Sequence, residues 1–345
     1  MEMTGLPAEI ISAFGLPNDP ATVSPIGTGH IHQTFRVSGV RSFIVQRVNK
    51  NVFRQPEVID INWTRAAQHL SAHYPDYPFL RCLPAAHGAT QVFDSNGFPW
   101  RVFPYIGNTF TIDQVATRQQ AYDAAAEFAR LCHHLDGADV SQFSETIPRF
   151  HDLSLRYDQF EEALQSALPE RKDQAESCIQ YARDARTLVD DYVRNTSNGA
   201  WKLRITHNDT KINNVLFDMT SGKTVYAIDL DTLMPGYFIY DVGDMIRTFV
   251  PPVSEEEKDL SLLRFRRDIY DVVVSGYRSE MDAVMSTEEL AYIPWSGKMM
   301  TYMMALRFLA DYLRGDTYYH TTYPGQNLVR ARNQFHWLGI LMKET

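Results

Sequence analysis

Residues 205–218, ITHNDTKINNVLFD, place several chemically able side chains directly before a β-prone run. His207, Asp209 and Asn214 follow the spacing His-x-Asp, four residues, Asn, which catalytic loops for phosphoryl transfer use. The aspartate can accept the proton of an attacking hydroxyl, and the asparagine can offer a neutral oxygen to Mg²⁺. Lys211 can neutralise charge on a phosphoryl group during transfer. The segment therefore indicates phosphoryl transfer, and the plain alternative is a polar turn before a buried strand.

A second acidic position follows in VYAIDLD, where Asp229 leaves an apolar strand fifteen residues after Asn214. That separation suits two paired strands and a turn, which would bring both side chains to adjacent strand ends facing one cleft. A carboxylate at a strand end is a common ligand for a hard cation. The pair therefore predicts a metal site, whereas Asp229 taken alone also fits a helix cap or a turn.

Further carboxylates follow at Asp231, Asp241 and Asp244. We expect one of them to hydrogen-bond His207 or the backbone of its loop rather than a metal. We also expect His207 to brace the loop rather than to act as the base.

Helices and strands must bring the segment 205–218 and the segment around Asp229 to one cleft. The hydrophobic pattern predicts these elements. The first hundred residues are strand-rich and include one amphipathic helix, and after about Asp113 helices dominate. The predicted strands cover 34–37, 42–48, 90–94, 98–106, 213–218 and 224–230. The predicted helices cover 57–74, 119–135, 153–168, 176–193, 254–278, 287–314 and 324–342.

Composition narrows the class of protein. The 345 residues suffice for two lobes, and 44% hydrophobic with 22% charged residues is an ordinary globular balance. A net charge of −9 argues against nucleic acid or an anionic membrane as a partner. The three separated cysteines suggest neither disulfides nor a zinc site, and neither a signal peptide nor an apolar span is evident. We therefore expect a cytoplasmic protein.

The chain resembles the aminoglycoside-phosphotransferase and choline-kinase superfamily of small-molecule kinases, through HNDTKINNVLFD and AIDLDTLMPGYFIYDVGD. Within it, the chain is most similar to the N-acetylhexosamine 1-kinases. That likeness rests on GTGHIHQTF, IVQRVN, TIPRFHD, RFLADYLRGDTYYHT and NLVRARNQF. The resemblance implies an α+β, bilobal, protein-kinase-like fold. The expected lobes are a nucleotide-binding lobe at 1–104 and a helical lobe at 105–345 that carries the catalytic loop, metal site and acceptor pocket.

The resemblance also implies roles at the motif positions. Asp209 would be the catalytic base, Asn214 and Asp229 would hold Mg²⁺, and the loop 27–32 would cover the phosphates of ATP. The loop residues expected at the nucleotide are Gly27, Thr28 and Gly29, and Lys211 is expected at the phosphates.

This chain departs from the wider pattern at two positions. Its glycine loop has G-x-G without a third glycine, and its third strand has Gln46 and Arg47 where many members have a phosphate-holding lysine. Arg47 is the candidate for that contact, but alternation lets only one of the two residues point into the cleft. Glu57 can pair with Arg47 or lie in solvent.

The remaining expectations concern the two substrates. Adenine would meet the link between the lobes, at Phe103, Pro104, Tyr105 and Ile106. The acceptor would lie near Asp209, beside Arg307, Asp311, Tyr318 and the neighbouring Tyr319, with His30 or His32 reaching across and Phe249 lining the pocket.

We therefore expect an ATP- and Mg²⁺-dependent kinase that phosphorylates the anomeric hydroxyl of an N-acetylhexosamine. The alternatives are a superfamily kinase for a choline, homoserine or aminoglycoside acceptor, and a nucleotide-binding regulator without catalysis.

Overall fold

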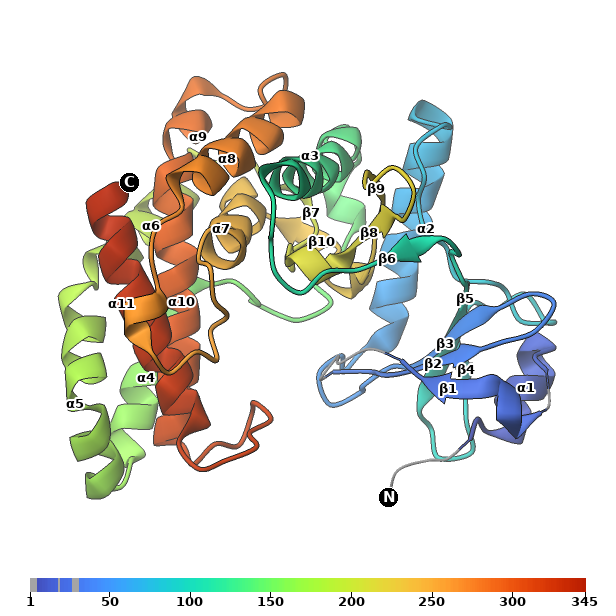
Figure 1. Cartoon of the computed structure of the whole chain (residues 1–345), viewed down its shortest axis with the longest axis horizontal. Coiled ribbons are helices and arrows are strands. Elements are labelled where there is room, and N and C mark those ends of the chain that lie inside the picture. Colours follow the sequence, from blue (N-terminus) through green and yellow to red (C-terminus); the bar gives the residue numbers. More distant parts are fainter. Residues whose placement is uncertain (1–4, 18, 27–30) are drawn as a thin grey trace.

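A computed structural model of the chain describes residues 5–17, 19–26 and 31–345. The expectations for Gly27, Thr28, Gly29 and His30 lie outside these residues. A small sheet-containing lobe and a larger, mostly helical lobe lie side by side, and the C-terminus lies in the helical lobe (Figure 1). This arrangement confirms the expected α+β bilobal fold.

The small lobe is a five-stranded antiparallel sheet with one helix on each face. The strands are β1 (Val23–Pro25), β2 (Gln33–Val37), β3 (Phe43–Arg47), β4 (Val92–Phe93) and β5 (Pro99–Pro104), in the order β1-β2-β3-β5-β4. One face packs with α1 (Ala8–Phe14) around Ile10, Val45 and Trp100. The other face meets the long α2 (Pro56–His73), where Trp63 contacts Phe103, and this contact joins the main core of the large lobe.

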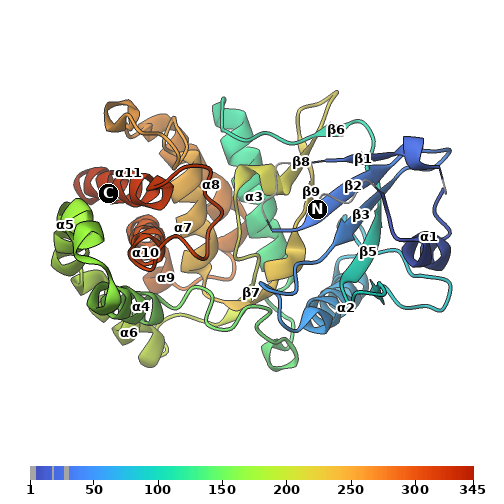
Figure 2. The ribbon, with the colours of Figure 1, turned by 90° about the horizontal axis from the view of Figure 1, so that it is seen from below.

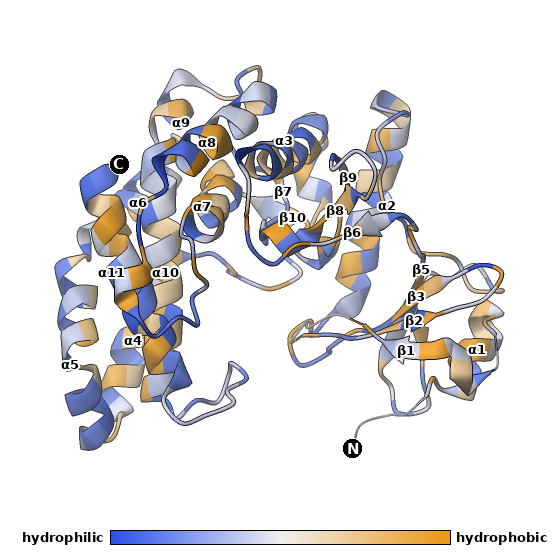
Figure 3. Ribbon diagram, viewed as in Figure 1, coloured by the Kyte–Doolittle hydropathy of each residue, from blue (hydrophilic) through white to orange (hydrophobic). Residues whose placement is uncertain are grey.

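The large lobe is built around one helix. This lobe contains the helices α3 (Arg118–His134), α4 (Leu153–Ser166), α5 (Pro169–Asp184), α6 (Thr187–Ser197), α7 (Phe238–Phe249), α8 (Arg267–Met281), α9 (Thr287–Ala291), α10 (Ile293–Leu313) and α11 (Gln326–Glu344). Helix α10 contacts α4, α5, α7 and α11, and Figure 2 shows it among them. Hydrophobic residues are dense on α7, whereas α5 is largely hydrophilic (Figure 3). Other elements enclose α7, since nearly all its residues are buried, including Asp241, Asp244 and Arg247.

Two small sheets bring the chemical motifs together. The strands β6 (Thr109–Phe110), β8 (Val215–Asp218) and β9 (Thr224–Ala227) form one sheet, in the order β6-β8-β9. The second pairs β7 (Arg204–Thr206) with β10 (Met234–Gly236). The segment 207–214, which contains Asp209 and Asn214, connects β7 to β8, and Asp229 follows β9.

Most predicted elements are present, but the helix expected over 254–278 begins only at Arg267. The preceding stretch is irregular because its side chains bond elsewhere. Arg266 donates to the carbonyl of Val250 at 2.9 Å, and Glu256 accepts from Arg330 at 2.6 Å. The predicted helix 176–193 is likewise divided between α5 and α6. Helices α1 and α7 were not predicted. Among the described residues, no helix has the length and apolarity needed to cross a bilayer.

Gly243 allows α7 to approach α10 closely, since a Cβ there would lie 2.5 Å from the carbonyl oxygen of Ser296. We expect Gly243→Ala to destabilise the fold by about 1–3 kcal/mol, because the helices must separate. Helix propensity alone predicts the opposite sign, a gain of about 1 kcal/mol. Urea unfolding with an unchanged slope measures the difference. Gly107→Ala, which meets no atom within 4 Å, is the control and should change little.

Candidate active site

The segment 207–214, which contains Asp209 and Asn214, is held by the first turn of α7. The Asp241 carboxylate accepts the backbone N–H of His207 at 3.0 Å and that of Asn208 at 2.7 Å. Thr210 Oγ1 donates to the Asp241 carbonyl at 2.7 Å. Burial raises the pKa of Asp241 to about 6 although its hydrogen bonds favour the ionised form. Asp241 is therefore the carboxylate that binds the loop backbone.

Asn208 turns the chain directly before Asp209. Its φ of 64° is left-handed, a conformation in which asparagine is enriched. Its Nδ2 donates to the carbonyls of Thr206 at 3.0 Å and Thr232 at 2.9 Å. Gly236 packs so closely here that a Cβ would lie 2.7 Å from Asn208 Oδ1. These contacts fix the direction in which Asp209 leaves the loop.

His207 joins the two motifs. Its Nδ1 accepts the backbone N–H of Asp209 at 3.2 Å, so Nε2 carries the proton and donates to the Ile228 carbonyl at 2.9 Å. Ile228 precedes Asp229. His207 is thus a brace, as expected, and not a base.

Asp209 is partly open to solvent, with 24% of its side chain exposed. Lys211 Nζ lies 3.1 Å from its Oδ1, and Asn214 Nδ2 donates to its Oδ2 at 3.1 Å. Burial opposes ionisation, but Lys211 foremost outweighs it and lowers the pKa of Asp209. The carboxylate is therefore ionised and oriented, as a group that accepts a hydroxyl proton must be.

Asn214 and Asp229 fit a divalent cation by their chemistry. The Asn214 amide directs Nδ2 to Asp209, which leaves Oδ1 available as a ligand atom. Asp229 is exposed, with a φ of 59°, and makes no ion pair among the described residues. Crowding by protein atoms and then the charges of Asp231 and Asp209 raise its pKa. A bound cation would relieve that repulsion, and oxygen ligands of this kind suit Mg²⁺.

The structure shows which face of β3 each of Gln46 and Arg47 occupies. Gln46 pairs with Arg101 across the sheet and accepts from Arg101 Nε at 2.9 Å, on the face towards α2 and Asp231. Arg47 lies on the other face, with its guanidinium 4.4 Å from the Phe98 ring centroid. A contact of Arg47 with the phosphates therefore stays a prediction. Glu57 has no ion pair with Arg47 within 4 Å in the part of the chain that the structure describes.

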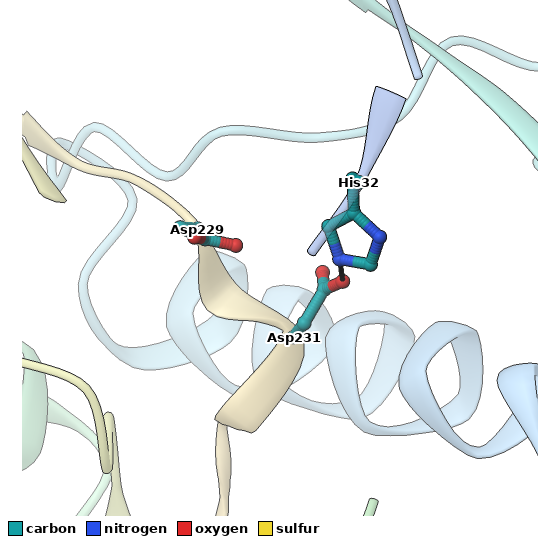
Figure 4. Close-up of side chains that lie close together, drawn as sticks. All are labelled: His32, Asp229 and Asp231. Atoms are coloured by element: carbon teal, nitrogen blue, oxygen red, sulfur yellow. Dashed lines mark ion pairs between the residues drawn. The ribbon is translucent and has the colours of Figure 1, made fainter. Parts of the chain in front are cut away.

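His32 does not reach towards an acceptor as expected. Its Nδ1 accepts the backbone N–H of Asn49 at 3.1 Å, and its Nε2 lies 2.7 Å from Asp231 Oδ2 (Figure 4). Both ring nitrogens are occupied, so His32 is a contact between the lobes.

The expected adenine segment lies where β5 leaves the small sheet. Phe103 and Pro104 belong to β5, and the Phe103 side chain is buried against Trp63. Tyr105 and Ile106 follow the strand, and the Tyr105 ring lies under the guanidinium of Arg36. A role in adenine binding stays a prediction for these four residues.

The acceptor side collects cations and aromatic rings beside the catalytic loop. His151 Nε2 bonds the Asn208 carbonyl at 2.7 Å, and the adjoining Phe150 ring lies 5.1 Å from the Arg307 guanidinium. Burial and then the charge of Arg307 lower the pKa of Arg156 to about 10. Among the described residues, no carboxylate oxygen lies within 4 Å of Arg307 or Arg156. Two guanidinium groups without a partner carboxylate therefore lie on this side.

Two expected acceptor residues have to be corrected. Phe249 is completely buried in the core, so it lines no open pocket. Asp311 is 4% exposed, and its carboxylate accepts the backbone N–H groups of the 317–319 loop and the Asn327 amide. It therefore holds that loop and has no free oxygen for a sugar. Tyr318 is exposed, and its role stays a prediction.

Sequence reasoning missed Arg101 and His151. Arg101 is the one charged residue of the apolar strand FPWRVFP, and this charge in an otherwise apolar run could have indicated a buried cation. His151 lies in TIPRFHD, a segment that carried the resemblance but was given no chemical role.

Comparisons with known proteins show the family to which the chain belongs. A sequence model described as "Phosphotransferase enzyme family" matches residues 22–268, well over half of the chain. The chain therefore belongs to this family.

Solved structures share its fold. A microcompartment-associated aminopropanol kinase has a TM-score of 0.70 at 14% identity, with 97% of this chain and 95% of that one covered. An aminoglycoside phosphotransferase from Alicyclobacillus acidocaldarius has 0.65 at 13%, covering 100% and 97%. An amicoumacin kinase in complex with AMP-PNP and Ca²⁺ has 0.63 at 15%, covering 98% and 95%.

Asp209→Asn keeps the size of the side chain but removes its ability to accept a proton. We expect the turnover number to fall by about 10²–10⁴-fold while the affinity for Mg²⁺–ATP changes little. Steady-state kinetics and calorimetric titration with a non-hydrolysable ATP analogue measure the two quantities. A variant that turns over at nearly the wild-type rate would exclude Asp209 as the base.

Burial lowers the pKa of His151 to about 3, and its buried Nδ1 has no hydrogen-bond partner among the described residues. Because the folded pKa lies below the unfolded value, this residue costs stability as the pH falls below about 6.5. The cost is about 1.4 kcal/mol per pH unit, or about 2 kcal/mol at pH 5. In urea unfolding, His151→Gln should lose that much less than the wild type on acidification. The exposed His87→Gln should follow the wild type, and parallel pH profiles for all three proteins would contradict the assignment.

Proposed function

We propose that this member of the phosphotransferase enzyme family transfers the γ-phosphoryl group of ATP to the anomeric hydroxyl of an N-acetylhexosamine. Residues 1–104 would bind the nucleotide and residues 105–345 the acceptor. The similar amicoumacin kinase, solved in complex with AMP-PNP and Ca²⁺, supports the use of ATP with a divalent cation. The choice of Mg²⁺ follows from the ligand atoms of Asn214 and Asp229.

The observation that carries the acceptor class is the charge beside Asp209. The guanidinium groups of Arg307 and Arg156 have no carboxylate within 4 Å among the described residues. They would repel a cationic acceptor such as choline or an aminoglycoside, which favour aromatic cages or acidic pockets. A neutral sugar with an N-acetyl carbonyl offers an oxygen acceptor to Arg307 instead. Arg156 contributes its charge, because its terminal nitrogens already donate to Gln159 and to the carbonyl of Phe150.

Aromatic groups complete this side. Tyr319 lies 4.8 Å from Phe308 and 5.6 Å from the Arg307 guanidinium, measured to its ring centroid. Its hydroxyl is buried and has no partner among the described residues, so a sugar hydroxyl is a suitable partner for it.

In the reaction, the sugar hydroxyl attacks the γ-phosphorus, the bond from that phosphorus to the bridging β–γ oxygen breaks, and the hydroxyl proton passes to Asp209. Lys211, 3.1 Å from Asp209, places a positive charge beside the transferring group. A divalent cation would neutralise charge on the β- and γ-phosphates. An anomeric hydroxyl is more acidic than an ordinary alcohol, so the lowered pKa of Asp209 remains compatible with its role. Positioning and electrostatics therefore supply most of the rate.

An acceptor panel tests the proposal. With ATP and Mg²⁺, we expect ADP release with N-acetylglucosamine or N-acetylgalactosamine, and at least about tenfold lower kcat/KM with choline and an aminoglycoside, since a repulsion of about 1.4 kcal/mol suffices for that factor. Homoserine, a zwitterion to which this repulsion does not apply, belongs in the same panel. The product should be the 1-phosphate by phosphorus NMR. No turnover on any N-acetylhexosamine would remove the sugar proposal. Nucleotide binding without turnover on any acceptor would favour a regulator.

A further inference from the structure

The Asp231 carboxylate connects the Asp229 segment to the small lobe. Asp231 is 2% exposed, and its Oδ1 lies 2.6 Å from Arg101 Nη1. Its Oδ2 accepts from Arg101 Nη2 at 2.8 Å and faces His32 Nε2 at 2.7 Å. Figure 4 shows His32 pointing at Asp231, with Asp229 lying beside them.

These side chains resemble a metal site but do not offer one. One ligand atom from each of His32, Asp229 and Asp231 lies within 4.8 Å of the others. However, His32 Nδ1 accepts the Asn49 N–H, so Nε2 carries the proton and has no lone pair for a metal. Both Asp231 oxygens are already paired with Arg101. Only Asp229 keeps its oxygens available.

The guanidinium of Arg101 is likewise occupied by contacts within the protein. It is 3% exposed, it bonds Asp231 and Gln46, and its guanidinium lies 5.1 Å from the Trp63 ring centroid and 5.3 Å from that of Phe103. Gln46 continues the connection by donating to Thr34 Oγ1 on β2 at 3.1 Å. A planar fork can hold both carboxylate oxygens at once, which a lysine cannot do. Arg101 therefore binds protein rather than phosphate.

Helix α2 fixes the backbone on the same side. Trp63 Nε1 donates to the Leu230 carbonyl at 2.7 Å, and Asn62 Nδ2 donates to the Leu233 carbonyl at 2.9 Å. Asp229 itself makes no side-chain hydrogen bond or ion pair among the described residues, so these neighbours determine where its carboxylate lies.

We propose that Arg101, Asp231 and His32 are positioning residues that hold Asp229 for its cation and link it to β2, the strand that follows the glycine loop. The proposal rests on the metal role given to Asp229 under the proposed function. These residues contact neither the cation nor the substrate. They act through the backbone between Asp231 and Asp229.

The first test compares two buried arginine–carboxylate pairs. Arg204 binds Glu289 with 1% and 3% of the two side chains exposed, and it contacts none of the residues that we place at the nucleotide, metal or acceptor. Arg101→Lys should weaken Mg²⁺-dependent binding of AMP-PNP, followed by calorimetry at varied Mg²⁺, by at least about tenfold, as loss of a supporting contact commonly does. Arg204→Lys should lower the melting temperature but leave that binding unchanged.

His32 supplies a second variant that decides the matter if Arg101→Lys does not fold. His32→Phe keeps the ring that stacks on Phe53, whose centroid is 5.4 Å away, but removes the donor to Asp231. We expect it to raise the Mg²⁺ concentration for half-maximal binding, and His32→Gln, which restores an N–H at that position, to recover most of the loss. Wild-type Mg²⁺ dependence in Arg101→Lys and His32→Phe would overturn the proposal. Because calorimetry needs no acceptor, failure of every sugar in the panel would leave this result standing.

Discussion

The site depends on keeping carboxylates of like charge together. The charges of Asp231 and Asp209 both act on Asp229 and, after the crowding of its carboxylate by protein atoms, they raise its pKa. Asp209 is offset by Lys211, and Asp231 by Arg101 and His32. Asp229 has no such partner among the described residues. Of these three carboxylates, only Asp229, the proposed cation ligand, therefore lacks a cationic partner in the part of the chain that the structure describes, and the negative potential there favours a divalent ion.

Holding these groups also requires unusual backbone. Asn208 and Asp229 are both left-handed, with φ of 64° and 59°, and such a conformation costs roughly 1–3 kcal/mol per non-glycine residue. The surrounding hydrogen bonds offset this cost. Asp241 binds two backbone N–H groups beside Asn208, and Trp63 and Asn62 bind the carbonyls that follow Asp229. His207 then connects the two bends through Ile228. The geometry of the site is therefore a property of the backbone as much as of the reacting side chains.

The extent to which sequence predicted this site follows from the same physics. Local spacing was sufficient to predict that Asp209 and Asn214 lie together, because the two residues are five positions apart and hydrogen-bond each other. Alternation could place Gln46 and Arg47 on opposite faces but could not choose between them, because the choice depends on Arg101, which lies 55 residues away. Asp311 looked suitable for a sugar because a carboxylate in a polar segment has the same sequence appearance whether it binds a ligand or a loop. Its partners are the N–H groups of the 317–319 loop, and the sequence does not show that this loop folds back onto Asp311.

The proposed catalytic and acceptor sides are supported by different parts of the fold. Asp209 depends on Asp241 of α7, which binds the loop backbone, and on His207, which connects the loop to the Asp229 segment that the small lobe holds. The acceptor side instead uses the segment before α4, with Phe150 and His151, and the 317–319 loop that Asp311 holds at the end of α10. Contact between the two sides runs through His151 and the Asn208 carbonyl. Substitutions on the acceptor side can therefore alter its charge and shape while the catalytic backbone stays in place. Such a division is consistent with a fold shared at 13–15% identity by proteins named as aminopropanol, amicoumacin and aminoglycoside kinases.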